Sequence, residues 1–141
     1  MRKSFHKEKQ GGLDFSYWKD QDGKNKFHPL PVILSNETVA TVQDRYGLPA
    51  GKKWSDCIYP FLENADKYIG KNSIAVCFLS TANREKGETI FQSAQKVNAE
   101  FMEYELKKDV PSGWMLFDFP SEELLDKVIT SNFEIYKEKL K

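Results

Sequence analysis

From residue 38 onward, two patterns of apolar and polar residues follow one another in turn along most of the chain. Three short runs rich in β-branched and aromatic residues predict buried strands, and each is followed by a segment with apolar side chains at steps of three or four, which predicts a helix. The predicted strands are residues 38–44, 73–80 and 114–119, and the predicted helices are residues 54–69, 90–107 and the segment from 121 onward. The second strand is apolar almost throughout, which is typical of a parallel strand covered on both faces.

Start and stop signals flank or interrupt these helices. Pro60 has no N–H to donate, so we expect it to kink the helix at 54–69 or to begin the helix again. Gly70 fits the end of that helix, and Ser121 is the expected N-cap of the last helix. The apolar stripe that we expect to be buried along the last helix consists of Leu124, Leu125, Val128, Ile129 and Phe133.

The order of the elements predicts an α/β fold. Right-handed crossovers place three neighbouring parallel strands in one sheet with the helices on one side. Such a sheet leaves one apolar face and one edge open, so we expect it to be part of a larger barrel or to pair with a partner. Residues 1–37 are polar and contain Gly11-Gly12 and Pro29-Leu30-Pro31, which predicts a long loop region. Residues 38–141 are then a single incomplete domain.

Composition narrows the function classes. The 141 residues contain 21 Lys+Arg and 21 Asp+Glu, so the formal net charge of zero gives no reason to expect a nucleic-acid partner. The sequence contains no apolar run of membrane-spanning length, and no apolar stretch follows its first basic residues, so we expect no signal peptide there. Cys57 and Cys77 lack the spacing of a metal site, and we expect both to be buried as free thiols. No metal or cofactor is expected.

The first predicted strand ends in chemistry suited to a ligand. The sequence Val42-Gln43-Asp44-Arg45-Tyr46 places a carboxylate and a phenol at the carboxyl end of the strand, where parallel α/β folds bind ligands. A second aromatic and acidic cluster lies upstream, at residues 15–20. Carboxylates accept hydroxyl protons and aromatic faces cover rings, so the two clusters together favour a polyol or sugar ligand.

These clusters resemble the inositol-binding part of bacterial-type phosphatidylinositol-specific phospholipases C. Three segments carry the resemblance, each similar to a family motif: a strand ending in Gln-Asp-x-Tyr, an apolar strand ending in Ser with a later Ala-x-x-x-Asn helix, and a Gly-Trp strand that ends in Asp before a final helix. They are Val42–Tyr46, Ile74–Ser80 with Ala94–Asn98, and Gly113–Phe119 with the helix up to Asn132. The resemblance covers only the second half of such an enzyme and implies the C-terminal portion of a distorted TIM-like (β/α) barrel.

The resemblance implies substrate-binding roles for five residues. Asp44 would accept a hydrogen bond from an inositol hydroxyl and Tyr46 would pack against the ring. Trp18 and Asp20 match a Trp-x-Asp on the preceding loop, and Arg2 matches a strand-end Arg that bonds inositol hydroxyls. Alternatives remain open: Asp44 is also suited to capping a turn, and Tyr46 and Trp18 to ordinary boundary positions.

The family reaction is the attack of the inositol 2-hydroxyl on phosphorus, assisted by two histidines as general base and general acid. The family places those histidines in the first half of the barrel, within short motifs. Neither His6 nor His28 stands in such a motif, so no catalytic residue is assigned. We expect a structural role for Asp118, at the end of its strand.

The leading interpretation is therefore part of a phospholipase C-like phosphodiesterase or lyase. Its expected partners are an inositol phospholipid or inositol phosphate, the missing N-terminal half-barrel, and a membrane surface in peripheral contact. The resemblance implies secretion for an intact family member. Two other interpretations stay open, a non-catalytic half-barrel that binds a polyol or a partner chain, and an unrelated small α/β domain without a ligand.

Overall fold

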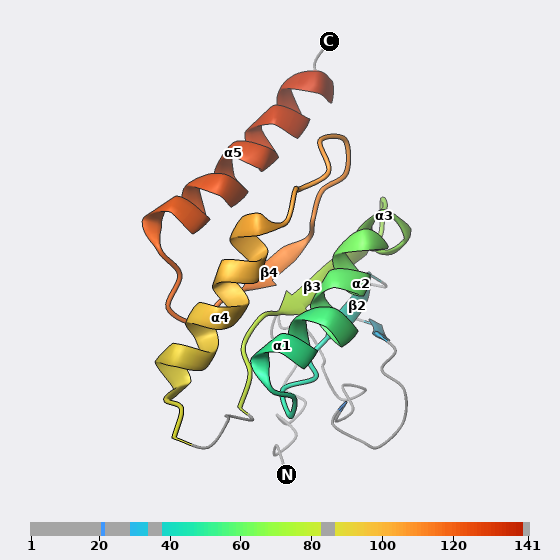
Figure 1. Cartoon of the computed structure of the whole chain (residues 1–141). Helices are drawn as coiled ribbons and strands as arrows, with labels where there is room; N and C mark the ends of the chain where they lie inside the picture. Colours follow the sequence, from blue (N-terminus) through green and yellow to red (C-terminus); the bar gives the residue numbers. More distant parts are fainter. Residues whose placement is uncertain (1–20, 22–28, 34–37, 83–86, 140–141) are drawn as a thin grey trace, which may run out of the picture.

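Helices cover one face of a mixed four-stranded sheet. The computed structural model describes residues 21, 29–33, 38–82 and 87–139. Figure 1 shows the helical rod of residues 50–68 and α4 side by side in front of the sheet, with α5 on the outer side of α4. The strands are β1 (Leu30–Ile33), β2 (Val39–Gln43), β3 (Ser73–Phe78) and β4 (Trp114–Leu116), in that spatial order.

The three predicted strands are parallel neighbours, as expected, and the fourth strand is a new finding. β2 pairs with β3 and β3 pairs with β4 in parallel register, whereas β1 pairs antiparallel with β2. Pro31 within the β1 sequence favours a loop, but proline is tolerated on an edge strand such as this one. Within the described residues the sheet is open, with β1 and β4 at its edges, so these residues do not form a closed barrel.

The first helical region is a broken rod. It consists of α1 (Ala50–Lys53), a π-helical segment (Trp54–Ile58), α2 (Tyr59–Glu63) and α3 (Ala65–Tyr68). Pro60 lies in the first turn of α2, and Ile58 and Tyr59 before it keep right-handed helical backbone angles, so the helix changes its hydrogen-bond pattern there and does not end. A wider π turn directly before the proline suits a ring that cannot donate an N–H to the preceding turn.

The later helices have defined starts. α4 (Ile90–Glu103) begins with a capping box, in which the backbone N–H of Gln92 donates to Thr89 Oγ1 at 3.2 Å and the Thr89 N–H donates to Gln92 Oε1 at 2.8 Å. α5 (Glu122–Lys139) begins after Ser121, whose Oγ accepts from the Leu124 N–H at 3.3 Å. The expected N-cap of the last helix is therefore confirmed.

The main core lies between the sheet and the helices. Its buried members come from the helical rod, β3 and the residue after it, α4 and α5: Ala50, Ile58, Phe61, Leu62, Ala75, Cys77, Leu79, Val97, Phe101 and Leu124. A smaller cluster of Val32, Ala40, Val42 and Val76 occupies the other face of the sheet. No helix in the described part of the chain is both long and apolar enough to cross a membrane.

The predicted buried stripe of α5 is wrong for three of its five residues. Leu124 is buried and Val128 packs against the core, but Leu125, Ile129 and Phe133 are 43%, 51% and 62% exposed. The reason is that α5 lies at the outer side of α4 (Figure 1) and meets the core along one line. The apolar stripe of α5 is wider than the surface that α4 can cover, so part of the stripe stays exposed.

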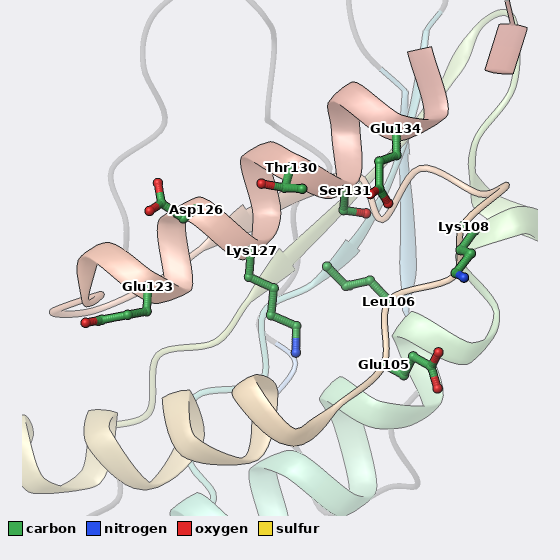
Figure 2. Close-up of a pocket in the computed structure, with 9 residues that line it drawn as sticks. All are labelled: Glu105, Leu106, Lys108, Glu123, Asp126, Lys127, Thr130, Ser131 and Glu134. Carbon is green, nitrogen blue, oxygen red and sulfur yellow. The ribbon is translucent and has the colours of Figure 1, made fainter. Parts of the chain in front are cut away.

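Lys127 of α5 caps the C-terminal end of α4. Its Nζ donates to the carbonyl oxygens of Phe101, Met102 and Tyr104 at 3.1, 2.5 and 2.6 Å. Figure 2 shows this side chain extending from α5 toward the end of α4. A cation there compensates the partial negative charge of the helix terminus and bonds carbonyl groups at the end of the helix, of which that of Phe101 also accepts from the Tyr104 N–H at 3.2 Å.

We expect Lys127→Met to lower the free energy of unfolding by about 1–3 kcal/mol, because hydrogen bonds to a charged group are lost and the carbonyls of α4 remain. Lys108→Met is the matched control, since Lys108 is an exposed lysine beside the same helix pair. Urea denaturation of both variants measures the difference. Equal, small effects of the two substitutions would show that the cap does not stabilise the fold.

Candidate functional site at the carboxyl edge of the sheet

Asp44 and Tyr46 both follow β2 at the carboxyl edge of the sheet. Asp44 comes directly after the last residue of the strand and is only 7% exposed, whereas Tyr46 is 38% exposed. Side chains alternate between the two faces of a strand. Ala40 and Val42 belong to the smaller cluster, so Asp44, two residues further on, lies on the same face of the sheet as they do. The edge thus combines a nearly buried carboxylate with an accessible aromatic ring.

Gln21 fixes the backbone on either side of Gln43. Its Nε2 donates to the Val42 carbonyl at 2.9 Å, and its Oε1 accepts from the Asp44 N–H at 2.7 Å. Sequence reasoning missed this contact, although Gln21 directly follows Asp20 in the second aromatic and acidic cluster. The predicted site residues Arg2, Trp18 and Asp20 lie outside the described residues.

A buried lysine lies behind the same strand end. Lys53 of α1 is fully buried, and its Nζ donates to Gln43 Oε1 at 3.3 Å and to the carbonyl oxygen of Arg45. Cys77 of β3, the register partner of Gln43, places its Sγ 3.7 Å from the same Oε1. Sequence analysis missed Lys53 because the predicted helix began at residue 54. The structure starts this helix at Ala50, which turns Lys53 toward the core.

Thr81 joins the segment after β3 to the segment after β2. Its hydroxyl is bonded to the carbonyl oxygens of Tyr46, at 3.1 Å, and Leu48, and the Ala82 N–H donates to the Tyr46 carbonyl at 2.9 Å. The backbone that carries Tyr46 is therefore held by a neighbouring strand end. Fixed backbone of this kind is suited to presenting side chains to a ligand in one geometry.

The ends of β3 and β4 are joined in a similar way. The Leu79 N–H donates to the Leu116 carbonyl at 2.9 Å. Asn98 of α4 donates from Nδ2 to the carbonyl oxygens of Asp118 and Phe119 at 3.0 and 3.2 Å. These bonds give a physical role to the asparagine of the Ala-x-x-x-Asn segment. They involve the backbone of Asp118, so the expected structural role of its carboxylate stays a prediction.

Both cysteines are buried free thiols, as expected. Burial raises the pKa of the Cys77 thiol to about 12, although the positive charge of Lys53 opposes the rise. Burial also raises the pKa of Cys57, against the charges of Lys53 and Arg45. A thiol with a raised pKa is a weak nucleophile, so neither cysteine is suited to covalent catalysis at this edge.

We expect neither thiol to react with Ellman's reagent at pH 8 in the folded protein, because reaction needs an accessible thiolate. Both should react after unfolding in guanidinium chloride. The absorbance of the released thionitrobenzoate, followed with and without denaturant, provides the measurement. Rapid reaction of either cysteine in the folded chain would mean that the rod and the sheet separate readily.

A groove of about 360 Å³ lies elsewhere, between α5 and the segment that follows α4 (Figure 2). Charged and hydroxyl side chains dominate its lining: Glu105, Leu106, Lys108, Glu123, Asp126, Lys127, Thr130, Ser131 and Glu134. α4 connects the carboxyl end of β3 to the amino end of β4, so its C-terminus and this groove lie at the opposite edge of the sheet from Asp44. With Lys127 serving as a helix cap, the groove does not compete with the carboxyl edge as the candidate site.

Comparison with known proteins finds structures that share this fold. No family model matches the chain, and no curated protein matches it. Solved structures of phosphatidylinositol-specific phospholipase C from Staphylococcus aureus do match, at 20% identity. A form with incorporated pentafluoro-Phe has a TM-score of 0.61 over 81% of this chain and 38% of that chain. A structure from work on modulation of membrane binding has a TM-score of 0.65 over 84% and 40%.

A third structure, a mutant of the same Staphylococcus aureus enzyme, has a TM-score of 0.60 over 84% of this chain and 39% of its own. The chain therefore spans about 40% of the length of the solved structures that it matches. At 20% identity the likeness shows the fold, a partial βα arrangement of the phospholipase type.

Proposed function

We propose that this chain is the inositol-binding portion of a phosphatidylinositol-specific phospholipase C-like phosphodiesterase. The observation that supports this most is that a nearly buried Asp44 and an exposed Tyr46 both follow β2 at the carboxyl edge of the sheet, on a fold shared with the Staphylococcus aureus enzyme. Ligands of parallel α/β folds bind at this edge.

Asp44 is the proposed hydroxyl acceptor. A nearly buried carboxylate makes stronger hydrogen bonds than an exposed one, because fewer water molecules compete for its oxygens. The exposed ring of Tyr46, two residues away, offers an apolar face to the carbon skeleton of a cyclic polyol. Together they distinguish a ring with several hydroxyls from a purely apolar ligand or a simple anion.

Trp18, Asp20 and Arg2 are the further proposed substrate-binding residues. For Trp18 and Asp20 the support comes from Gln21, which is hydrogen-bonded to the end of β2 on both sides of Gln43. Trp18 and Asp20 belong to the segment immediately before Gln21 in the sequence. For Arg2 the support is the resemblance of the sequence alone. Residues 1–37 would then contribute to the mouth of the site, and residues 38–141 would form part of a (β/α) barrel.

We propose that the groups for acid–base catalysis are not among these substrate-binding residues. His6 and His28 are the histidines of the sequence and both lie outside the described residues. The proposed substrate of the whole protein is an inositol phospholipid, which would require peripheral contact with a membrane. One matched structure comes from work on membrane binding by the Staphylococcus aureus enzyme, and this supports the proposal.

Calorimetric titration of the 141-residue chain with myo-inositol tests the binding function. We expect saturable binding with one site per chain, and much weaker binding of the open-chain polyol mannitol, because a flexible chain must lose more conformational entropy. Failure to bind myo-inositol, or equal binding of both polyols, would refute an inositol site.

A second candidate function is a non-catalytic half-barrel that binds a partner chain. It is favoured by Trp114 and Leu116 of β4, which are 60% and 40% exposed on an edge strand, and by the exposed residues of α5. The proposed partner is the complementary half of the same barrel. Strong fluorescence of a dye that binds apolar surface, lost on addition of that half, would support this function. A monodisperse monomer without dye binding would contradict it.

A further inference from the structure

Lys53 stands out because a fully buried lysine is costly unless its charge is well bonded. Its hydrogen bonds described above both go to one strand end: the side chain of Gln43 and the backbone carbonyl of Arg45. These two residues flank Asp44. A buried cation with hydrogen bonds to both neighbours of the proposed acceptor requires a local explanation.

We propose that Lys53 is a positioning residue for the carboxyl end of β2, which sets the direction in which Asp44 and Tyr46 leave the strand. This inference rests on the proposed function of that edge. Lys53 does not itself contact the ligand. It acts from the helix-covered side of the sheet, through Gln43 and Arg45.

The alternation of side chains makes this arrangement effective. Gln43 faces the helices, where Lys53 and Cys77 both donate to its Oε1. Its Nε2 has no hydrogen-bond partner among the described residues, so those two donors determine how the amide is oriented. With Gln43 held on one face, Asp44 is directed to the other face.

The second contact of Lys53 limits the path of the chain after the strand. Its bond to the Arg45 carbonyl holds the peptide unit that joins Arg45 to Tyr46. Thr81 holds the next carbonyl, that of Tyr46, from the side of β3. Three consecutive residues, from Asp44 to Tyr46, are thus fixed by Gln21, Lys53 and Thr81 respectively.

Lys53→Met tests the inference, since methionine has a similar length and lacks the charge and the donors. Lys52→Met is the matched control, because Lys52 is the exposed neighbour in the same helix. In the 15N-labelled 141-residue chain without ligand, we expect Lys53→Met to shift the amide signals of Asp44, Arg45 and Tyr46. We expect it to raise the Kd for myo-inositol about tenfold, a misplacement effect below the hundredfold loss seen when reacting groups are displaced.

Lys52→Met should change neither the amide signals nor the Kd. Unchanged signals and a Kd within about twofold of wild type in folded Lys53→Met would overturn the inference. If Lys53→Met does not fold, Gln43→Leu provides the decision, because it removes one partner of Lys53 and keeps the charge bonded to Arg45. The same shifts with a raised Kd would then support a positioning role, and no change would overturn it.

The two proposals fail in different ways. A wild-type chain that does not bind myo-inositol refutes the proposed function, while the amide signals of the ligand-free variants still report whether Lys53 positions the strand end. Normal inositol binding together with unchanged amide signals in folded Lys53→Met leaves the proposed function intact and refutes the role of Lys53.

Discussion

Asp44→Asn is expected to weaken myo-inositol binding about tenfold or more. The amide keeps the size of the side chain, removes its negative charge and replaces one acceptor with a donor. A hydrogen bond to a charged group contributes about 1.5–3 kcal/mol, and each 1.4 kcal/mol corresponds to a factor of about ten in affinity. The backbone N–H of Asp44 donates to Gln21, and this bond does not depend on the side chain.

Asp66→Asn is the control for this substitution, because Asp66 is an exposed carboxylate on α3, in a different part of the chain. Calorimetric titration gives the Kd of each variant, and circular dichroism gives the folded fraction. If Asp44→Asn unfolds the chain but leaves the affinity per folded molecule unchanged, Asp44 is a structural cap and its assignment to the ligand is wrong.

Gly113→Ala is expected to produce the largest loss of stability, about 2–5 kcal/mol. Gly113 precedes β4 with a φ of +81°, a backbone conformation that costs other residues about 1–2 kcal/mol. A Cβ atom there would lie 2.5 Å from the carbonyl oxygen of Ala75 and 2.7 Å from its Cβ. These atoms belong to the centre of β3, so relief of the contact requires the two strands to separate, and such overpacking costs about 1–3 kcal/mol.

Gly51→Ala provides the opposite control. Gly51 lies in α1, and a Cβ atom added there would meet nothing within 4 Å, so alanine should stabilise the helix by about 0.5–1 kcal/mol. Urea denaturation of both variants gives the two free energies of unfolding. A Gly113→Ala variant as stable as wild type would show that β4 is not packed against β3 as described.

The parallel strands were predictable because their signal is local. Each consists of a run of apolar residues with turn residues on both sides, and β3 is buried at its centre as the continuous apolar run predicts. β1 was not predictable, since Pro31 favours a loop until its position at a sheet edge is known. The exposure of Leu125, Ile129 and Phe133 likewise depends on where α5 lies, which periodicity does not specify.

The candidate site was predictable only in part. The sequence identifies Asp44 and Tyr46, because they directly follow a recognisable strand. Gln21 and Lys53 were not predicted. Gln21 contacts a strand that is distant in the sequence, and Lys53 lies just outside the helix as it was predicted. A lysine inside a polar stretch is normally taken for a surface residue, and only its burial against Gln43 distinguishes it.

The most direct test of the central proposal is a map of amide shifts in the 15N-labelled chain during titration with myo-inositol. We predict that the signals which move most belong to Gln21 and to residues 44–46, at the carboxyl edge of the sheet. Shifts confined to Leu106, Thr130 and the other residues of the groove between α5 and the segment after α4 would contradict the proposal. The absence of any shift at saturating myo-inositol would contradict it equally.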